Sequence, residues 1–332
     1  MEHSINKVFV CLTTIQKATE AVRKFAAIPG YRVVVTGDLK TPAPYGLEAN
    51  QGTFLNVQEQ NAAFPELSEA LPVNSYTRKN VAYAVAIREG ASVIVDTDDD
   101  NIPYDDFEIF PFDASYDTTA SDLGLVNIYK AFTDQKIWPR GLPLPEITKA
   151  ENPLDQYAPT AVRVGVWQGL ADGDPDVDAI YRLVDGSACI FNRRAPLVLA
   201  PGTWTPFNSQ NTVFRREVFP LLYIPCTVTF RFSDILRSWV AQPILWQAGY
   251  TLGFTRATVF QDRNPHNYMV DFESEIPMYL QAYRSVEVAR NAVSPHNSLL
   301  GNLWNAYQAL GEAGIVQPQE FAALKAWLKL FE

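Results

Sequence analysis

Residues 92–101 read SVIVDTDDDN, and this stretch decides the fold class. Its β-branched start at 92–95 predicts a strand, and the helical run at 75–89 before it ends at Gly90. This order is typical of an α/β fold with a mostly parallel central sheet flanked by helices, whose strands present their carboxyl ends at one edge. Strand and helix signals alternate further upstream as well, at 8–12, 15–27 and 31–35.

The rest of the chain has weaker signals up to about residue 159 and helical signals at its end. Many Pro and Asp residues at 103–159 predict irregular connections and short strands. Beyond residue 280 the pattern is wholly helical, so we divide the chain into a domain at 1–284 and a helical segment at 285–332. The apolar stripe of that segment predicts packing against the domain or contact with a second copy of the chain: Leu299, Leu303, Tyr307 and Leu310.

The composition is that of an acidic globular protein. The 332 residues include 27 Lys and Arg against 37 Asp and Glu, a formal net charge of 27 − 37 = −10. A chain of this charge repels phosphate backbones, so we expect no nucleic-acid partner. With 47% hydrophobic and 19% charged residues the chain can bury a large core, which excludes a mainly disordered protein.

Neither a membrane span nor a disulfide framework is predicted. No stretch approaches the roughly 18 to 20 uncharged apolar residues of a span, and the apolar run at 8–12 is too short for a signal peptide. The three cysteines are an odd number at wide spacing, which argues against a disulfide framework and a cysteine-type zinc site. We expect a soluble protein of the cytoplasm without a transmembrane segment.

Four aspartates in five positions follow the predicted strand at 92–95: Asp96, Asp98, Asp99 and Asp100. Like charges this close repel and raise each other's pKa, whereas a hard divalent cation removes the cost. Mg²⁺ and Mn²⁺ take carboxylate oxygens and keep phosphate oxygens in their remaining positions. The segment is therefore either a metal site or a solvated acidic turn.

Two cations are expected to lie near these aspartates. The helix at 75–89 returns through a tight link into the strand, so its first turn, with Arg78 and Lys79, is predicted at the same edge of the sheet. The helix dipole favours anions there, and metal-holding carboxylates opposite cations describe a diphosphate site. The alternative is that Arg78 and Lys79 are ion-pair partners of the aspartates.

The first two strands end in residues suited to a base and a ribose. Small hydroxyl side chains and a glycine at neighbouring strand ends offer hydrogen bonds at the switch point of a parallel sheet. Ordinary strand-to-helix turns are the alternative for each of them. The candidates are Thr13 and Thr14 after the first strand, and Gly37, Asp38 and Lys40 after the second.

At this point the sequence resembles the STELLO family of glycosyltransferases. The likeness extends in order over about residues 5 to 285. It is carried by the runs VVVTGDLKTP (33–42), LPVNSYTRKNVAYAVAIREGASVIVDTDDDN (71–101), IWPRGLPL (137–144), GDPDVDAIYRL (173–183), PFNSQNTVFRREVFPLLYIP (206–225) and FRFSDILRSWVAQPILWQAGY (230–250).

The resemblance implies a GT-A, Rossmann-like fold that binds a nucleotide-diphosphosugar, with a C-terminal helical extension. It implies an Asp-x-Asp motif at Asp96 and Asp98. In this motif the first aspartate contacts ribose or metal, and the second coordinates the metal through the diphosphate. Asp99 continues the acidic run. The implied function is metal-dependent transfer of a sugar, with Mn²⁺ or Mg²⁺, from a nucleotide sugar to a glycan or glycoconjugate acceptor. Alternatives are a sugar-nucleotide mutase and a non-catalytic scaffold of polysaccharide assembly.

Four more residues are assigned candidate roles on this basis. Asp234, which begins a predicted helix, is expected to deprotonate or position the acceptor, with helix capping as the alternative. Asp176 and Asp178 in GDPDVD are second candidates, again with capping as the alternative. His266 is expected to supply a later metal ligand, and a hydrogen-bonded loop histidine is the alternative.

Overall fold

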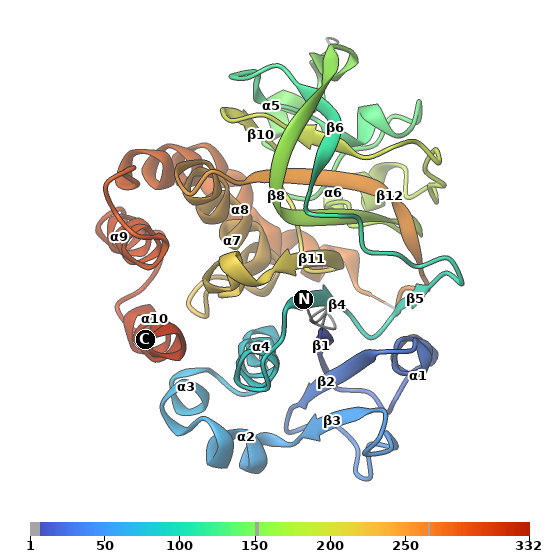
Figure 1. Cartoon of the computed structure of the whole chain (residues 1–332), viewed down its shortest axis with the longest axis vertical. Coiled ribbons are helices and arrows are strands. Elements are labelled where there is room, and N and C mark those ends of the chain that lie inside the picture. Colours follow the sequence, from blue (N-terminus) through green and yellow to red (C-terminus); the bar gives the residue numbers. More distant parts are fainter. Residues whose placement is uncertain (1–6, 150–152, 265) are drawn as a thin grey trace, which may run out of the picture.

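The computed structural model describes residues 7–149, 153–264 and 266–332 as a mixed α/β protein built on one large sheet (Figure 1). Ten strands form this sheet in the order β3-β2-β1-β4-β11-β8-β6-β9-β12-β5. Their bounds are β1 Val8–Thr14, β2 Tyr31–Gly37, β3 Gly52–Leu55, β4 Val93–Thr97, β5 Asn101–Pro103, β6 Asp113–Thr119, β8 Tyr157–Gly173, β9 Leu197–Leu199, β11 Asn211–Arg215 and β12 Thr251–Gln261. A separate pair is formed by β7 Gly124–Leu125 and β10 Thr203–Trp204.

Helices flank the sheet and fill the C-terminal part of the chain. The α-helices are α1 Glu20–Ala27, α2 Val57–Ala63, α3 Pro65–Ala70, α4 Lys79–Arg88, α5 Leu144–Ile147, α6 Ala179–Val184, α7 Phe230–Gln247, α8 Tyr268–Ala292, α9 Leu299–Glu312 and α10 Glu320–Leu328. Short 3-10 helices lie at η1 Tyr76–Arg78, η2 Ile128–Ala131, η3 Pro153–Asp155, η4 Arg216–Leu222 and η5 Lys329–Phe331.

The N-terminal part of the sheet is parallel, as the alternating signals predict. Strands β3, β2, β1 and β4 all run the same way, with Thr14 opposite Gly37 and Cys11 opposite Asp96. Ser75 begins the helical segment before β4, and Gly90, with φ +82°, ends it. The segments that follow β1, β2 and β4 therefore emerge at one edge of the sheet.

The other part of the sheet is mixed, and its longest strand was not predicted. β8 has 17 residues and pairs with β11 and β6 in antiparallel fashion and with β12 in parallel. Its first seven residues are mostly exposed and its last ten are all buried. Side chains along β8 thus do not alternate between core and solvent, so the period-two signal of a strand is missing from the sequence.

The C-terminal helices pack on the α/β part of the same chain. In Figure 1 helices α8, α9 and α10 follow one another along one flank, where α10 contacts α3. The boundary predicted after residue 284 falls inside α8, which is one continuous helix. Leu303, Tyr307 and Leu310 of the predicted stripe are buried in the core, which supports packing over a dimer contact. In the described part of the chain, no helix is both long and apolar enough to cross a membrane.

Candidate functional site

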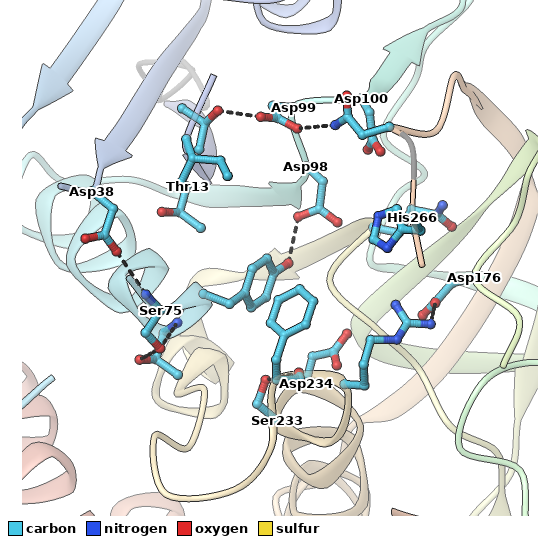
Figure 2. Close-up of a pocket in the computed structure, with 18 of the residues that line it drawn as sticks. Thr13, Asp38, Ser75, Asp98, Asp99, Asp100, Asp176, Ser233, Asp234 and His266 are labelled. Atoms are coloured by element: carbon cyan, nitrogen blue, oxygen red, sulfur yellow. Dashed lines mark hydrogen bonds and ion pairs between the residues drawn. The ribbon is translucent and has the colours of Figure 1, made fainter. Parts of the chain in front are cut away.

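A cavity of about 560 Å³ opens at the edge where the parallel strands end (Figure 2). Segments after β1, β2, β4 and β12 line it together with η1 and the first turn of α7. It collects eight of the predicted site residues: Thr13, Thr14, Asp38, Asp98, Asp99, Asp176, Asp234 and His266. Six others do not line it: Gly37, Lys40, Arg78, Lys79, Asp96 and Asp178.

Asp98 lines the cavity with one carboxylate oxygen that makes no hydrogen bond in the part of the chain that the structure describes. Its Oδ1 accepts hydrogen bonds from the Tyr76 hydroxyl at 2.7 Å and from Lys79 Nζ at 3.0 Å. Its Oδ2 has no hydrogen-bond partner among the described residues. Burial raises the pKa of Asp98 to about 6 despite the nearby ammonium group of Lys79. An ionised Asp98 therefore lacks full compensation from the protein.

Asp99 and Asp100 extend the same acidic wall. Asp99 Oδ2 accepts a hydrogen bond from Thr14, and Asp100 Oδ2 accepts one from Gln261 at 3.1 Å. Burial raises the pKa of both carboxyl groups above the usual value. Pairing of β5 with β12 holds this segment against residues 261–264. Three carboxylates whose charged forms are disfavoured thus lie side by side.

Asp96 corrects the sequence-based assignment of a metal ligand. Its side chain is fully buried, 2.7 Å from Lys79 Nζ through Oδ1 and 2.8 Å from Arg237 Nη1 through Oδ2. Because each oxygen contacts a cation and the buried side chain does not line the cavity, the structure does not support Asp96 as a ligand of a metal bound in the cavity. The ion-pair alternative is thereby confirmed for Lys79, whose charge is already shared by Asp96 and Asp98.

Arg78 also lies where it cannot perform its predicted role. Its guanidinium is fully buried behind η1 and donates to Gln60 Oε1, to Ser68 O and Oγ and to Leu71 O. Every one of these partners belongs to the α2–α3 region or the turn after it. Arg78 therefore anchors the start of α4, and it neither reaches a diphosphate in the cavity nor pairs with the aspartates.

The strand ends after β1 and β2 divide into cavity-lining and structural positions. Thr13 and Thr14 line the cavity, although Thr13 Oγ1 donates to Thr36 O at 2.9 Å. Asp38 accepts from the backbone N–H groups of Asn74 and Ser75, at 2.8 and 2.9 Å, and so holds η1 in place. Gly37 has a structural role, because a Cβ at this position would lie only 2.7 Å from the ring of Phe54. Lys40 is exposed and lies outside the cavity.

Arg140 clamps two of the predicted catalytic acids on the opposite wall. Its Nε and Nη2 donate to Asp176 at 2.8 and 2.7 Å, and its Nη1 and Nη2 donate to Asp234 at 3.0 and 2.8 Å. Burial alone would raise the pKa of Asp176, but Arg140 and Arg231 lower it to about 2. Asp176 is therefore held ionised, with little tendency to accept a proton near neutral pH.

The environment of Asp234 does not fit either of its sequence-based roles. Besides Arg140, Oδ1 accepts from Ile235 N at 3.0 Å and Oδ2 accepts from Ser209 N at 3.2 Å. These four donors occupy the four acceptor positions of a carboxylate, so no lone pair is left for an acceptor hydroxyl. Nor is Asp234 a helix cap, because α7 begins at Phe230 with Thr229 as its N-cap.

Asp178 caps a helix, which was the predicted alternative to a catalytic role. It is the N-cap of α6, accepting from Tyr181 N at 2.9 Å and from Trp138 Nε1 at 2.8 Å. The residue is fully buried outside the cavity, and burial raises its pKa to about 6. A catalytic role is therefore not supported for Asp178.

We expect Asp178→Asn to stabilise the protein at pH 8. The pKa of Asp178 in the folded chain, about 6, lies above its ordinary value, so its stability contribution is complete below about pH 4 and is lost as the pH rises through 6. Asn imitates the protonated acid and also caps helices well. Urea unfolding should show a gain of up to about 3 kcal/mol at pH 8 that shrinks towards pH 5. A variant less stable than the parent at pH 8 would contradict this.

The loop after β12 contributes a cation that sequence reasoning missed. The Arg263 side chain is 8% exposed and lines the cavity, with its closest carboxylate oxygens 3.7 Å away on Asp174 and 4.0 Å away on Asp271. Its Nε has no hydrogen-bond partner within the described structure. Burial, reinforced by Arg182 and Arg231, lowers the pKa of Arg263 to about 10. The charge of Arg263 is therefore incompletely neutralised. Its position three residues before His266, a candidate metal ligand, is the sequence feature that could have identified it.

His266 lies at the same loop, beside the acidic wall (Figure 2). Its Nδ1 is 3.1 Å from Asp271 Oδ2. A carboxylate on one ring nitrogen orients the other nitrogen, an arrangement that is usual for histidines that bind metals. Even so, among the described residues no three His, Cys, Asp or Glu side chains form a group that could hold a metal ion by themselves. A metal here would need further ligands.

An apolar wall completes the cavity. Cys226, Val228 and Phe230 line it from the segment that leads into α7. Phe230 is 53% exposed, and its ring lies edge-on to Tyr76, with 5.3 Å between the ring centroids. An aromatic surface of this kind suits the apolar face of a sugar ring. The cavity thus combines acidic, basic and apolar walls.

Comparison with known proteins confirms the resemblance seen in the sequence. A family model described as STELLO glycosyltransferases matches residues 231–325. Two Arabidopsis thaliana proteins, "Probable glycosyltransferase STELLO1" and "Probable glycosyltransferase STELLO2", are each 26% identical to this chain over 343 residues. The alignments cover 97% of this chain and 44% of each relative, so the chain spans less than half the length of these relatives.

Two solved structures of one enzyme are distant matches to this chain. Glucosyl-3-phosphoglycerate synthase from Mycobacterium tuberculosis, in complex with phosphoglyceric acid, has a TM-score of 0.40 at 10% identity, covering 87% of this chain and 81% of that one. The same enzyme in complex with Mn²⁺ and uridine-diphosphate-glucose also has a TM-score of 0.40, at 11% identity, covering 87% and 80%.

Proposed function

We propose that this protein is a metal-dependent glycosyltransferase that takes its sugar from a nucleotide-diphosphosugar bound in the cavity. One observation carries the proposal. Three carboxylates with burial-raised pKa values and an incompletely neutralised arginine line the same cavity at the carboxyl edge of parallel strands. A divalent cation would compensate the carboxylates, and a diphosphate would compensate the arginine. The names of the similar Arabidopsis proteins support transfer of a sugar as the reaction.

The acidic wall fits a hard divalent cation bound partly by its ligand. Mg²⁺ commonly takes only one or two protein carboxylates and completes its shell with water and substrate phosphates. Asp98, through its unpartnered Oδ2, and Asp99 would be those carboxylates, and His266 is retained as a further candidate. When bound, the ion would stabilise charge on the leaving diphosphate.

Arg263 replaces Arg78 and Lys79 as the cation that would hold the diphosphate. Arg263 lines the cavity and its guanidinium makes no hydrogen bond to the described residues, whereas the side chains of Arg78 and Lys79 are occupied elsewhere. Thr13, Thr14 and the backbone at 74–77 would surround the nucleoside, as the ends of parallel strands do in other nucleotide sites. The aromatic surface at Phe230 would contact the saccharide acceptor.

Arg263→Gln is expected to weaken binding of UDP about 10- to 100-fold in the presence of Mn²⁺ and to change uridine binding by less than about threefold. A hydrogen bond to a charged group contributes roughly 1.5 to 3 kcal/mol, and the nucleoside lacks the diphosphate. Arg256→Gln is the matched control, because Arg256 lies on β12 but pairs with Asp106 and Glu108 outside the cavity. Equal losses for UDP and uridine would remove Arg263 from the diphosphate site.

The reaction itself is tested with a panel of UDP and GDP sugars incubated with the protein and Mn²⁺ or with EDTA. We expect slow hydrolysis of at least one donor, with water as the acceptor, that requires the metal. Binding of a nucleotide sugar without hydrolysis, and without transfer to added oligosaccharides, would favour a scaffold over an enzyme. An exchange of the sugar within the nucleotide sugar would favour a mutase.

A further inference from the structure

The segment 223–230, which forms the apolar wall of the cavity, is held from behind by the C-terminal helix α10. Cys226, Val228 and Phe230 line the cavity, and the alternate residues Thr227 and Thr229 make hydrogen bonds to neighbouring elements. A segment without helix or strand hydrogen bonds of its own needs such partners to keep one conformation. The geometry of this wall therefore depends on what contacts its outer side.

Most of these contacts come from one buried carboxylate. Glu320, the first residue of α10, is fully buried and accepts from the Tyr223 hydroxyl at 2.5 Å. It also accepts from Cys226 N at 3.0 Å and from Thr227 N and Oγ1 at 2.9 and 2.6 Å. In the described part of the chain Glu320 has no ion-pair partner, so these hydrogen bonds alone compensate its charge.

A residue that served only to pack α10 would be apolar, like its neighbours. Ala323, Leu324 and Trp327 fill the core beside it. A buried carboxylate is costly unless its lone pairs are filled, so it is sensitive to the exact position of its donors. The start of the segment is fixed independently, by two hydrogen bonds between the side chain of Asn80 in α4 and the backbone of Ile224. The end of the segment is held by Thr229 Oγ1, which donates to Ser274 O of α8, and by α7 itself; Glu320 holds the middle, at residues 226 and 227.

We propose that Glu320 is a positioning residue for the cavity, which holds Cys226 and Val228 in place in the wall against which ligands bind. The C-terminal helices are then part of the site, although none of their residues lines the cavity. The effect on ligands rests on the proposed function, whereas the effect on the position of the wall does not. The thiol of Cys226 reports that position directly.

Cys226 is suited to this measurement because the other two cysteines, Cys11 and Cys189, are buried. We expect Glu320→Gln to raise the rate of Cys226 alkylation by iodoacetamide, followed by mass spectrometry, at least about tenfold. Glutamine has nearly the same shape but points an N–H group at one of the donors. Leu324→Ala, a cavity-forming change in the same helix, is the control for lost stability and should change the rate less than about twofold.

A second variant separates the effect of Glu320 on the position of the wall from the effect of its charge on the thiol of Cys226. Loss of the Glu320 charge by itself would ease formation of the thiolate, because burial and Glu320 together raise the pKa of Cys226 to about 12. Thr227→Val keeps the charge and removes two hydrogen bonds, the one of 2.6 Å to Glu320 and the one of 3.0 Å that Thr227 Oγ1 accepts from Gln317 N. We expect it too to raise the alkylation rate several-fold. An unchanged rate in Thr227→Val, or an equal rise in Leu324→Ala, would overturn the positioning role.

Ligand protection distinguishes this inference from the proposed function. UDP with Mn²⁺ is expected to slow alkylation of Cys226 in the parent protein and to do so less in Glu320→Gln and Thr227→Val, with UDP affinity reduced about three- to tenfold in both. If the variants raise the alkylation rate but UDP, GDP, ADP and CDP with Mn²⁺ all fail to protect the thiol, the positioning role stands and the proposed class of ligand is wrong. If UDP protects all variants equally, Glu320 has no role in the site.

Discussion

Asp98→Asn is expected to weaken Mn²⁺-dependent binding of UDP by about 100-fold or more while leaving the fold intact. Asp98 supplies an unpartnered oxygen at the cavity, and an amide is a much poorer ligand for a hard cation than a carboxylate. Because burial raises the pKa of Asp98, removing its charge relieves a cost, and the variant should unfold at no lower urea concentration than the parent at pH 8. Isothermal titration calorimetry with Mn²⁺ measures the affinity.

Asp100→Asn is the matched control for this change. Asp100 lines the same wall and its pKa is also raised by burial, but Gln261 holds its Oδ2. The two variants alter the net charge of the cavity equally. We expect Asp100→Asn to change metal-dependent affinity less than about fivefold. Similar losses in both would mean that the wall acts through its overall charge and that Asp98 is no ligand.

Arg140→Met is expected to have the largest effect on stability, a loss of about 3 to 5 kcal/mol at pH 8. The change leaves Asp176 and Asp234, both almost completely buried, without the guanidinium that each of them contacts through two hydrogen bonds. In the parent protein the pKa of Asp176 is about 2, so its stabilising contribution is present above pH 4 and is lost only as the pH falls through 2.

The variant should show the opposite pH dependence. Without Arg140, burial raises the pKa of Asp176, so the destabilisation should shrink as the pH falls from 8 to 5. Arg215→Met is the control, because its partners Asp113 and Glu217 are about half exposed and stay hydrated when it is removed. Urea unfolding at the two pH values measures the loss. A loss below about 1 kcal/mol, or one independent of pH, would show that Arg140 is not the centre of a buried charge cluster.

The parts of the fold that the sequence predicts are those with a clear local period. Strands β1, β2 and β4 and helix α4 follow from β-branched runs, a capping serine and a terminating glycine. Strand β8 could not be predicted in this way, because its exposed first part and its completely buried last part both lack alternation. Nor does local sequence specify the pairing of β5 with β12, which brings residues far apart in the chain together.

Some residues of the candidate site could likewise be predicted from the sequence, and others could not. The acidic segment and the ends of β1 and β2 reach the cavity as expected because parallel strands end at a common edge. The direction of individual side chains could not be predicted. Asp96 and Arg78 are close in sequence to residues that line the cavity, but the side chain of Asp96 points behind the strand and that of Arg78 points behind η1. Arg263 and Glu320 act across long sequence separations, through β12 and α10, which no local pattern reveals.

Binding of nucleoside diphosphates to the unaltered protein tests the central claim most directly. Calorimetric titrations with UDP, GDP, ADP and CDP, each in Mn²⁺ and in EDTA, require no knowledge of the acceptor. We predict that at least one of them binds, and that its affinity is at least about tenfold higher with the metal, a difference of roughly 1.4 kcal/mol. Absence of binding by all four in Mn²⁺, or equal affinity in EDTA, would contradict a metal-dependent nucleotide-diphosphate site in this cavity.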